Sequence, residues 1–250
     1  MNITPDLLKA LAQARRVTVL TGSGVSAESG VPTFRDAQTG LWSRYKPEEL
    51  ATPQAYRRNP RLVWEWYAWR RELVQKAYPN PAHYALAQME RQVPQFTLLT
   101  QNVDGLHREA GSRKVIELHG NIFRVKCAQE GQIVKYWRES GEIPPRCPYC
   151  NGPLRPDVVW FGEALPGNAL DAAWRAARDS EVFLSVGTSG LVQPAAILPV
   201  MAKDHGGLLV EINPNETPLT KQADYVMAGP AAVILPALVK AVWGEKVPTE

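Results

Sequence analysis

Three absences narrow what this chain can be. The chain has only three cysteines, too few for the disulfide framework of a small secreted protein. No run of about 18 apolar residues occurs, which excludes a membrane-spanning helix, and the first residues are expected to form an amphipathic helix and not a signal peptide. The net charge of +3 is small, and no basic run stands out, so no nucleic-acid partner is expected. We expect a cytoplasmic protein.

What is present indicates an α/β fold. The 250 residues are 45% hydrophobic, enough for one large domain or for one domain with a smaller insertion. Patterns typical of helices, such as Ala82–Gln92 and Ala169–Arg178, lie between apolar runs of strand length. Because strands alternate with helices, we predict a doubly wound parallel sheet. Its expected strands are Val17–Leu20, Phe96–Leu99, Val115–Leu118, Val182–Val186 and Leu208–Ile212.

Two stretches interrupt this alternation. Residues 39–79 are rich in tryptophan and are predicted to be helical. Residues 122–156 hold all three cysteines together with glycine and proline, and are predicted to form a small insertion held by a metal.

The first predicted strand runs into a glycine-rich loop. The spacing Gly22-x-Gly24-x-x-Ala27 fits the dinucleotide fingerprint, in which one glycine makes the turn and the next admits a pyrophosphate. The N–H groups of the following helix would face the phosphates. A glycine turn with a purely structural role explains this motif almost as well, so the loop alone favours a nucleotide only slightly.

The residues after this loop argue against a hydride-transfer enzyme. Such an enzyme continues through a full helix into a second strand that ends in an acidic residue about 20 residues on. Here Gly30 and Pro32 limit the helix to a turn or two, and no apolar strand follows. A dinucleotide remains compatible with the sequence, whereas a dehydrogenase is disfavoured.

Polar or glycine-rich turns follow all five predicted strands. In a parallel sheet these turns lie on one edge, which is where open α/β folds bind ligands. Loop chemistry alone does not explain five such turns, and we predict a binding site there. The turns are Thr21–Gly24, Thr100–Asp104, His119–Asn121, Gly187–Ser189 and Asn213–Asn215.

With these motifs the chain resembles the sirtuins, which are NAD-dependent protein-lysine deacylases. The resemblance covers nearly the whole chain and is carried, in family order, by Gly22–Ser26, Gly30–Arg35, Thr100–Asp104, Leu118–Gly120, Phe161–Glu163, Gly187–Ser189 and Asn213–Asn215. It implies a large Rossmann-like part (1–38, 80–121 and 157–250). It also implies a small part with a helical segment (39–79) and a zinc ribbon (122–156). NAD and an acyl-lysine peptide would meet between the two parts.

The resemblance also implies roles for individual residues. The acyl oxygen displaces nicotinamide from the ribose, and His119, with Asn102 nearby, would be catalytic, the imidazole acting as general base on a ribose hydroxyl. His83, His107 and His205 lack such a context and are expected to be structural or on the surface. The implied cofactor-binding residues are Gly22, Ser23, Gly24, Ser26, Thr33, Phe34, Arg35, Gln101, Asn102, Asp104, Gly187, Thr188, Ser189, Asn213, Asn215 and Ala231.

Two features concern the acyl-lysine substrate. Val159 and Phe161 lie in an apolar segment, expected to be extended, that matches the family's peptide-pairing strand. Helical spacing puts Tyr67 and Arg70 side by side on one face, and a phenol beside a guanidinium suits a carboxylate. The pair matches the Tyr-x-x-Arg of sirtuins that remove succinyl and malonyl groups. The alternative is a surface arginine that lies over tryptophans.

The cysteine spacing is compatible with a structural zinc ion. Cys127, Cys147 and Cys150 occupy positions of the four-cysteine zinc pattern, but Glu130 replaces the remaining cysteine. Two alternatives stay open at this point. The carboxylate of Glu130 or a water completes the site, or the site is weakened and the ribbon depends on local packing.

Two other functions are compatible with parts of the pattern. A mono-ADP-ribosyltransferase would displace nicotinamide in the same way but would transfer the ribose to a protein nucleophile. A sensor would bind NAD or ADP-ribose without catalysis. The Tyr67 and Arg70 pair and the peptide-binding segment favour deacylation over the first. The joint presence of His119, Asn102 and Asp104 disfavours the second.

Overall fold

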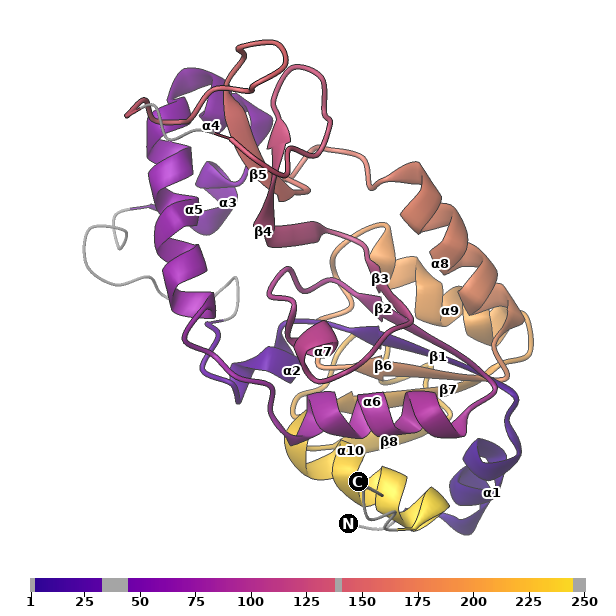
Figure 1. Ribbon diagram of the computed structural model, residues 1–250. Helices are drawn as coiled ribbons and strands as arrows, with labels where there is room; N and C mark the ends of the chain where they lie inside the picture. The colour runs from indigo at the N-terminus through magenta and orange to yellow at the C-terminus, as the bar shows by residue number, and fades with distance from the viewer. Residues whose placement is uncertain (1–2, 33–44, 138–140, 245–250) are drawn as a thin grey trace.

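Six parallel strands form the central sheet of the computed structural model, which describes residues 3–32, 45–137 and 141–244. Their order is β3-β2-β1-β6-β7-β8 (Figure 1), so the chain moves outward in one direction from β1 and later returns to fill the other side. The strands are β1 (Arg16–Thr21), β2 (Gln95–Thr100), β3 (Val115–Glu117), β6 (Val182–Val186), β7 (Leu208–Asn213) and β8 (Tyr225–Ala228).

Helices cover both faces of this sheet. On one face α1 (Pro5–Gln13), α6 (Pro81–Gln92) and α10 (Ala231–Trp243) bury an aliphatic core, and α2 (Gly24–Ala27) and α7 (Leu106–Glu109) lie near the strand ends. On the other face α8 (Gly167–Asp179), the 3₁₀ turn η2 (Ala195–Ile197) and α9 (Leu198–Asp204) bury a second core. This is the doubly wound arrangement that the alternation of strands and helices predicts.

A second region lies beyond the carboxyl edge of the sheet (Figure 1). It contains α3 (Pro47–Leu50), α4 (Pro53–Arg58), α5 (Pro60–Val74) and the antiparallel pair of β4 (Gly120–Cys127) and β5 (Leu154–Val158). Its cores are rich in aromatic side chains and separate from those of the sheet. Proline at the start of each helix fits the first turn, where the missing N–H costs nothing.

The five predicted strands are all confirmed to within two residues of their ends, and Gly30, with φ of +77°, ends the short turn that follows α2. The sequence did not predict β8 or the β4–β5 pair. Strand β8 is a four-residue edge strand with one buried side chain, which leaves little apolar pattern to detect. Within the described part of the chain, none of the helices has the length and apolar character needed to cross a bilayer.

Candidate functional site

Two glycine loops meet where the strand order reverses, between β1 and β6. The backbone N–H of Gly22 donates to the carbonyl of Val186 (3.0 Å), and that of Gly24 donates to the carbonyl of Gly187 (2.9 Å). A reversal of strand order at the carboxyl edge opens a crevice in α/β sheets. The loops after β1 and β6 therefore form the floor of the candidate site.

Glycine is required here for backbone contact. A Cβ on Gly22 would lie 2.7 Å from the carbonyl oxygen of Gly187, and one on Gly24 would lie 2.8 Å from the same atom. Gly187 itself has φ of +59°, and a Cβ there would lie 2.7 Å from the nitrogen of Val25. The glycines thus let the two loops pack on each other, in addition to the pyrophosphate approach expected from their spacing.

Thr188 connects the loops that follow β2, β6 and β7. Its Oγ1 accepts a hydrogen bond from Nε2 of Gln101 (3.0 Å), and its carbonyl oxygen accepts one from Nδ2 of Asn213 (2.8 Å). Three of the polar turns that the sequence assigned to one edge therefore touch each other. Ser189 follows, half-buried.

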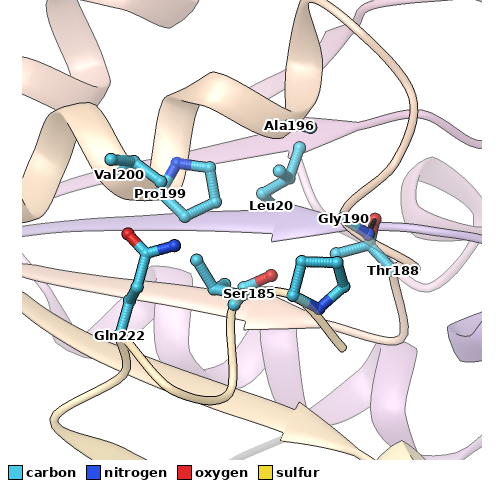
Figure 2. Close-up of a pocket in the computed structure, with 10 residues that line it drawn as sticks. Leu20, Ser185, Thr188, Gly190, Ala196, Pro199, Val200 and Gln222 are labelled. Atoms are coloured by element: carbon cyan, nitrogen blue, oxygen red, sulfur yellow. Dashed lines mark hydrogen bonds between the residues drawn. The ribbon is translucent and has the colours of Figure 1, made fainter. Parts of the chain in front are cut away.

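A small cavity lies behind Thr188, on the side of the sheet that α9 covers. Figure 2 shows Ser185 between Gln222 and Thr188, and its Oγ is buried without a hydrogen-bond partner in the described structure. The cavity has a volume of about 50 Å³ and is mostly apolar, so it adjoins the floor of the site without being large enough for a nucleotide. Its other lining residues are Leu20, Gly190, Ala196, Pro199, Val200, Pro218 and Leu219.

His119 is held in one tautomer at this edge. It lies just after β3, and its Nδ1 is 3.0 Å from the carbonyl oxygen of Gln101. A carbonyl can only accept, so Nδ1 carries the proton and Nε2 is left as a proton acceptor. Burial lowers the pKa of His119, partly offset by this hydrogen bond. The ring is therefore neutral near pH 7, as a general base must be.

Asn102, Ser26 and Asp104 form one buried chain of hydrogen bonds. Asn102 Nδ2 donates to the carbonyl of Gly22 (3.0 Å) and to Oγ of Ser26 (3.1 Å), and Ser26 donates to Asp104 (2.7 Å). Burial raises the pKa of Asp104 against the opposing hydrogen bonds from Leu106 and Ser26. The network fixes the amide plane of Asn102 beside the first glycine loop.

Two further histidines lie beneath this network. His83 Nε2 is 3.4 Å from Ser26 Oγ, His107 Nε2 is 2.9 Å from Thr21 Oγ1, and their rings are 4.8 Å apart. Burial lowers the pKa of His83 to about 4 and that of His107 to about 3, so both rings are neutral. His83 also caps α6 through Asn80. The sequence expected no site role for it, although the Asn-Pro-x-His start of α6 marks it as a capping residue.

The remaining predicted cofactor residues are distributed as follows. Ser23 is exposed at the start of α2, Asn215 is exposed after β7, and Ala231 is buried at the first position of α10. Thr33, Phe34 and Arg35 lie outside the described residues.

On α5 the predicted helical spacing of Tyr67 and Arg70 is confirmed, since both lie within this helix. Val63, Tyr67 and Val74 are buried, and Arg70 lies between the last two. Burial raises the pKa of Tyr67 to about 12, while the charge of Arg70 acts in the opposite direction, as expected of adjacent side chains. The guanidinium carbon of Arg70 is 5.2 Å from the centroid of the Trp66 ring, so the arginine also lies over a tryptophan.

The segment after β5 joins the two halves of the candidate site. The N–H of Val159 donates to the carbonyl of His119 (2.9 Å), and the indole Nε1 of Trp160 donates to the phenol oxygen of Tyr67 (3.0 Å). The segment is extended only as far as Trp160. A turn then closes by a hydrogen bond from Glu163 N to the carbonyl of Trp160 (2.9 Å), with Gly162 at φ of +85° and Phe161 exposed.

The three cysteines come together as predicted. The sulfur atoms of Cys127, Cys147 and Cys150 all lie within 4.8 Å of one another. Backbone N–H groups of Glu130 and Gly152 point at two of them, each at 3.4 Å, as in sites where thiolates bind a metal. The carboxylate of Glu130 is exposed and outside the cluster. The set fits a structural zinc site with three protein thiolates.

Comparison with known proteins gives one consistent family. The sequence pattern of the Sir2 family matches residues 22–194. An NAD-dependent protein deacylase of Aquifex aeolicus (strain VF5) is 57% identical over 209 residues, which is 83% of this chain and 87% of that protein.

Solved structures agree with this match. A complex of a Sir2 homologue with NAD superposes with a TM-score of 0.90 at 49% identity, covering 96% of this chain and 94% of the other. A Sir2 protein bound to an acetylated peptide superposes with a TM-score of 0.87 at 29% identity, covering 98% of this chain and all of the other.

Proposed function

This chain belongs to the Sir2 family and is an NAD-dependent protein deacylase, and we propose that it removes succinyl and malonyl as well as acetyl groups from protein lysines. The products would be nicotinamide, the free lysine and O-acyl-ADP-ribose. The relative in complex with acetylated peptide supports acyl-lysine as the substrate class. The proposal that acidic acyl groups are removed rests on two side chains of α5, Tyr67 and Arg70.

At the sheet edge, bound NAD would supply the ribose carbon that the acyl oxygen attacks as the bond from this carbon to nicotinamide breaks. His119 would remove a proton from a ribose hydroxyl through Nε2, since Nδ1 is engaged with Gln101. The side chain of Asn102 would orient the nicotinamide end, because Gly22 and Ser26 already fix its amide plane. Gln101 would lie beside Asn102 in the nicotinamide and ribose pocket. Ser189 and Asn213 would reach the adenosine half, and Thr188 holds the side chains of both Gln101 and Asn213.

In the acyl pocket, Tyr67 and Arg70 would bind the distal carboxylate of a succinyl or malonyl group. The phenol is protonated at neutral pH because burial raises its pKa to about 12, so it can donate a hydrogen bond. A guanidinium provides charge and two parallel donors, which suit a carboxylate better than they suit a methyl group. An acetyl group would enter without using either side chain.

The observation that carries this proposal is the Val159–Trp160 link. Two consecutive residues contact His119 and Tyr67, so the proposed base and the proposed acyl pocket are adjacent. The N–H groups of Val159, Trp160 and Phe161 are all bonded within the protein. A substrate peptide would therefore pair through its own N–H groups with carbonyl oxygens of this segment.

We also propose the division into an NAD-binding part (1–38, 80–121 and 157–250) and a small part (39–79 and 122–156). Separate aliphatic and aromatic cores support it. The β4–β5 pair crosses both boundaries at its base, where Gly120 pairs with Val158, so the pair is the physical connection between the parts.

Arg70→Met tests the acyl specificity. We expect kcat/KM for a succinyl-lysine peptide to fall about ten- to hundredfold, because a charge-assisted hydrogen bond is lost, while kcat/KM for the acetyl peptide stays within about twofold. Arg71→Met is the matched control, because Arg71 lies over Trp64 on the same helix (5.1 Å). Equal loss on both peptides would contradict the proposal. Transfer of labelled ADP-ribose from NAD to a protein acceptor, without formation of free lysine, would indicate ADP-ribosyl transfer. If no nicotinamide were released, the protein would be a sensor.

A further inference from the structure

We infer that Trp160 is a positioning residue for acyl specificity, which turns the phenol of Tyr67 so that its proton faces the acyl group. The inference rests on the proposed function, because it assigns a cause to the behaviour of the pocket on α5. The residue lies outside the Tyr-x-x-Arg pair. Its indole nitrogen bonds to the phenol oxygen of Tyr67, and the two rings lie 6.4 Å apart between centroids.

The direction of this hydrogen bond is fixed by chemistry. An indole N–H can only donate, so the phenol oxygen of Tyr67 is the acceptor at 3.0 Å. Tyr67 remains protonated at neutral pH, and its own O–H therefore points away from Trp160. No acceptor for that proton is found among the described residues. A carboxylate entering beside Arg70 would supply one.

Trp160 is itself held in place by Arg155 and Glu163. The guanidinium carbon of Arg155 lies 3.2 Å from the centroid of a Trp160 ring, and Arg155 makes two hydrogen bonds to Glu163 (2.6 and 2.9 Å). Glu163 also accepts from the backbone N–H of Trp160 (2.9 Å). Burial opposes ionisation of Glu163, but the hydrogen bonds from Arg155 and Trp160 lower its pKa, so the Glu163 carboxylate is charged at neutral pH.

This arrangement matters only for an acyl group that accepts hydrogen bonds at its distal end. If the indole N–H is removed, the phenol proton can rotate among several directions, and binding a carboxylate must then fix it. An acetyl methyl group accepts no hydrogen bond, so its turnover does not depend on the direction of that proton. Trp160 should thus change the ratio of the two activities and leave the chemistry at His119 unchanged.

The experiment compares Trp160→Phe with Tyr56→Phe. The first keeps an aromatic ring over Arg155 and deletes the N–H. The second deletes a buried hydroxyl in the same aromatic layer, by which we mean the packed rings of Tyr56, Tyr67 and Trp160. The hydroxyl of Tyr56 donates to the carbonyl of Leu154 (2.7 Å), and the ring of Tyr56 lies 5.2 Å from that of Trp160. We expect Trp160→Phe to raise KM for the succinyl peptide about three- to tenfold with kcat nearly constant, as for one lost hydrogen bond. Neither variant should change kcat/KM for the acetyl peptide alone.

A double variant separates this role from general packing. In the Tyr67→Phe background, Trp160→Phe should have no further effect on the ratio of succinyl to acetyl kcat/KM, because the acceptor of the indole N–H has gone. Equal loss on both peptides, or an effect that adds fully to that of Tyr67→Phe, would overturn the inference. If Tyr67→Phe and Arg70→Met leave the ratio unchanged, the proposed function fails as well. If they change it and Trp160→Phe does not, the inference alone fails.

A second measurement uses proteins in which Trp160 is intact, so that it does not depend on the folding of the Trp160→Phe variant. In protein labelled with ¹⁵N-tryptophan, the indole N–H resonance of Trp160 should shift, and its exchange with water should quicken, when Tyr67→Phe removes the acceptor. The resonance of Trp64, which contacts Arg71, is the internal control. An unchanged Trp160 resonance would show that the indole does not donate to Tyr67, and this would overturn the inference.

Discussion

The sheet edge and the aromatic layer beside α5 hold their side chains by different means. At the edge, backbone atoms of the loops after β1 and β6 are in contact, and the polar side chains are anchored on carbonyl groups of Gly22, Gln101 and Thr188. In the aromatic layer, side chains hold side chains, as where Trp160 contacts Tyr67 and Arg155.

This difference separates catalysis from specificity. A group anchored on the backbone of a buried sheet can move only if the sheet moves, so the geometry around His119 should tolerate few changes. A group anchored on another side chain can be altered by a substitution that leaves the backbone in place. We therefore expect changes at the sheet edge to affect all acyl substrates or the whole fold, and changes in the aromatic layer to affect one class of substrate.

The largest effect is expected for His119→Ala. Loss of a positioned general base should reduce kcat by about 10²- to 10⁴-fold, and by the same factor for succinyl and acetyl peptides. His205→Ala is the matched control, since that ring is exposed at the end of α9 with Nδ1 bound to the carbonyl of Met201 (2.9 Å). A loss confined to one acyl group would break the separation between the two regions.

The pH profile sharpens the same prediction. The imidazole must be neutral to act as a base, and burial lowers the pKa of His119 below the usual value of about 6.5. Activity should therefore persist as the pH falls through 6.5 and should decline only below it. An acid limb of kcat/KM centred at or above pH 6.5 would show that another group, or a more exposed ring, controls the reaction.

The next largest effect is expected at the contact between the glycine loops. Gly187→Ala should lower the free energy of unfolding by about 3 kcal/mol, because the new Cβ meets backbone nitrogen at 2.7 Å and φ is +59°. Gly206→Ala has a similar φ of +87° but open space around it, and should cost only about 1 kcal/mol. Urea unfolding of both variants measures the difference. Equal costs would mean that the loops adjust and that the edge is less rigid than the contacts imply.

Much of this architecture could be predicted because the sheet carries a clear pattern. Runs such as Val17–Leu20 and Val182–Val186 are short, buried on both faces and followed by glycine turns. Their length, composition and flanking turns therefore indicate strands, and a parallel sheet places those turns at one edge. The shared face of Tyr67 and Arg70 on α5 could be predicted from helical periodicity, since a spacing of three residues fixes which side chains lie together.

Other features depend on contacts between distant residues and leave no local pattern. The hydrogen bond from Trp160 to Tyr67 spans 93 positions in the chain, and that from Gln101 to Thr188 spans 87. The turn after Trp160 was missed because an apolar Val-Trp-Phe run predicts a strand, whereas Gly162 and the hydrogen bonds of Glu163 favour the turn. The packing of Gly24 against Gly187 is likewise invisible until both loops are placed.

The smallest effect is expected behind Thr188, where the edge meets the cavity of Figure 2. Ser185→Ala removes a buried hydroxyl without a hydrogen-bond partner in the described structure and should stabilise the protein by up to about 1 kcal/mol. Ser180→Ala is the matched control, because Ser180 is also buried but donates to the carbonyl of Ala177 (2.7 Å), and it should destabilise by about 1 kcal/mol. Thermal unfolding resolves the opposite signs. Destabilisation by Ser185→Ala would mean that the hydroxyl is satisfied within the cavity, and that this pocket is part of the support for Thr188.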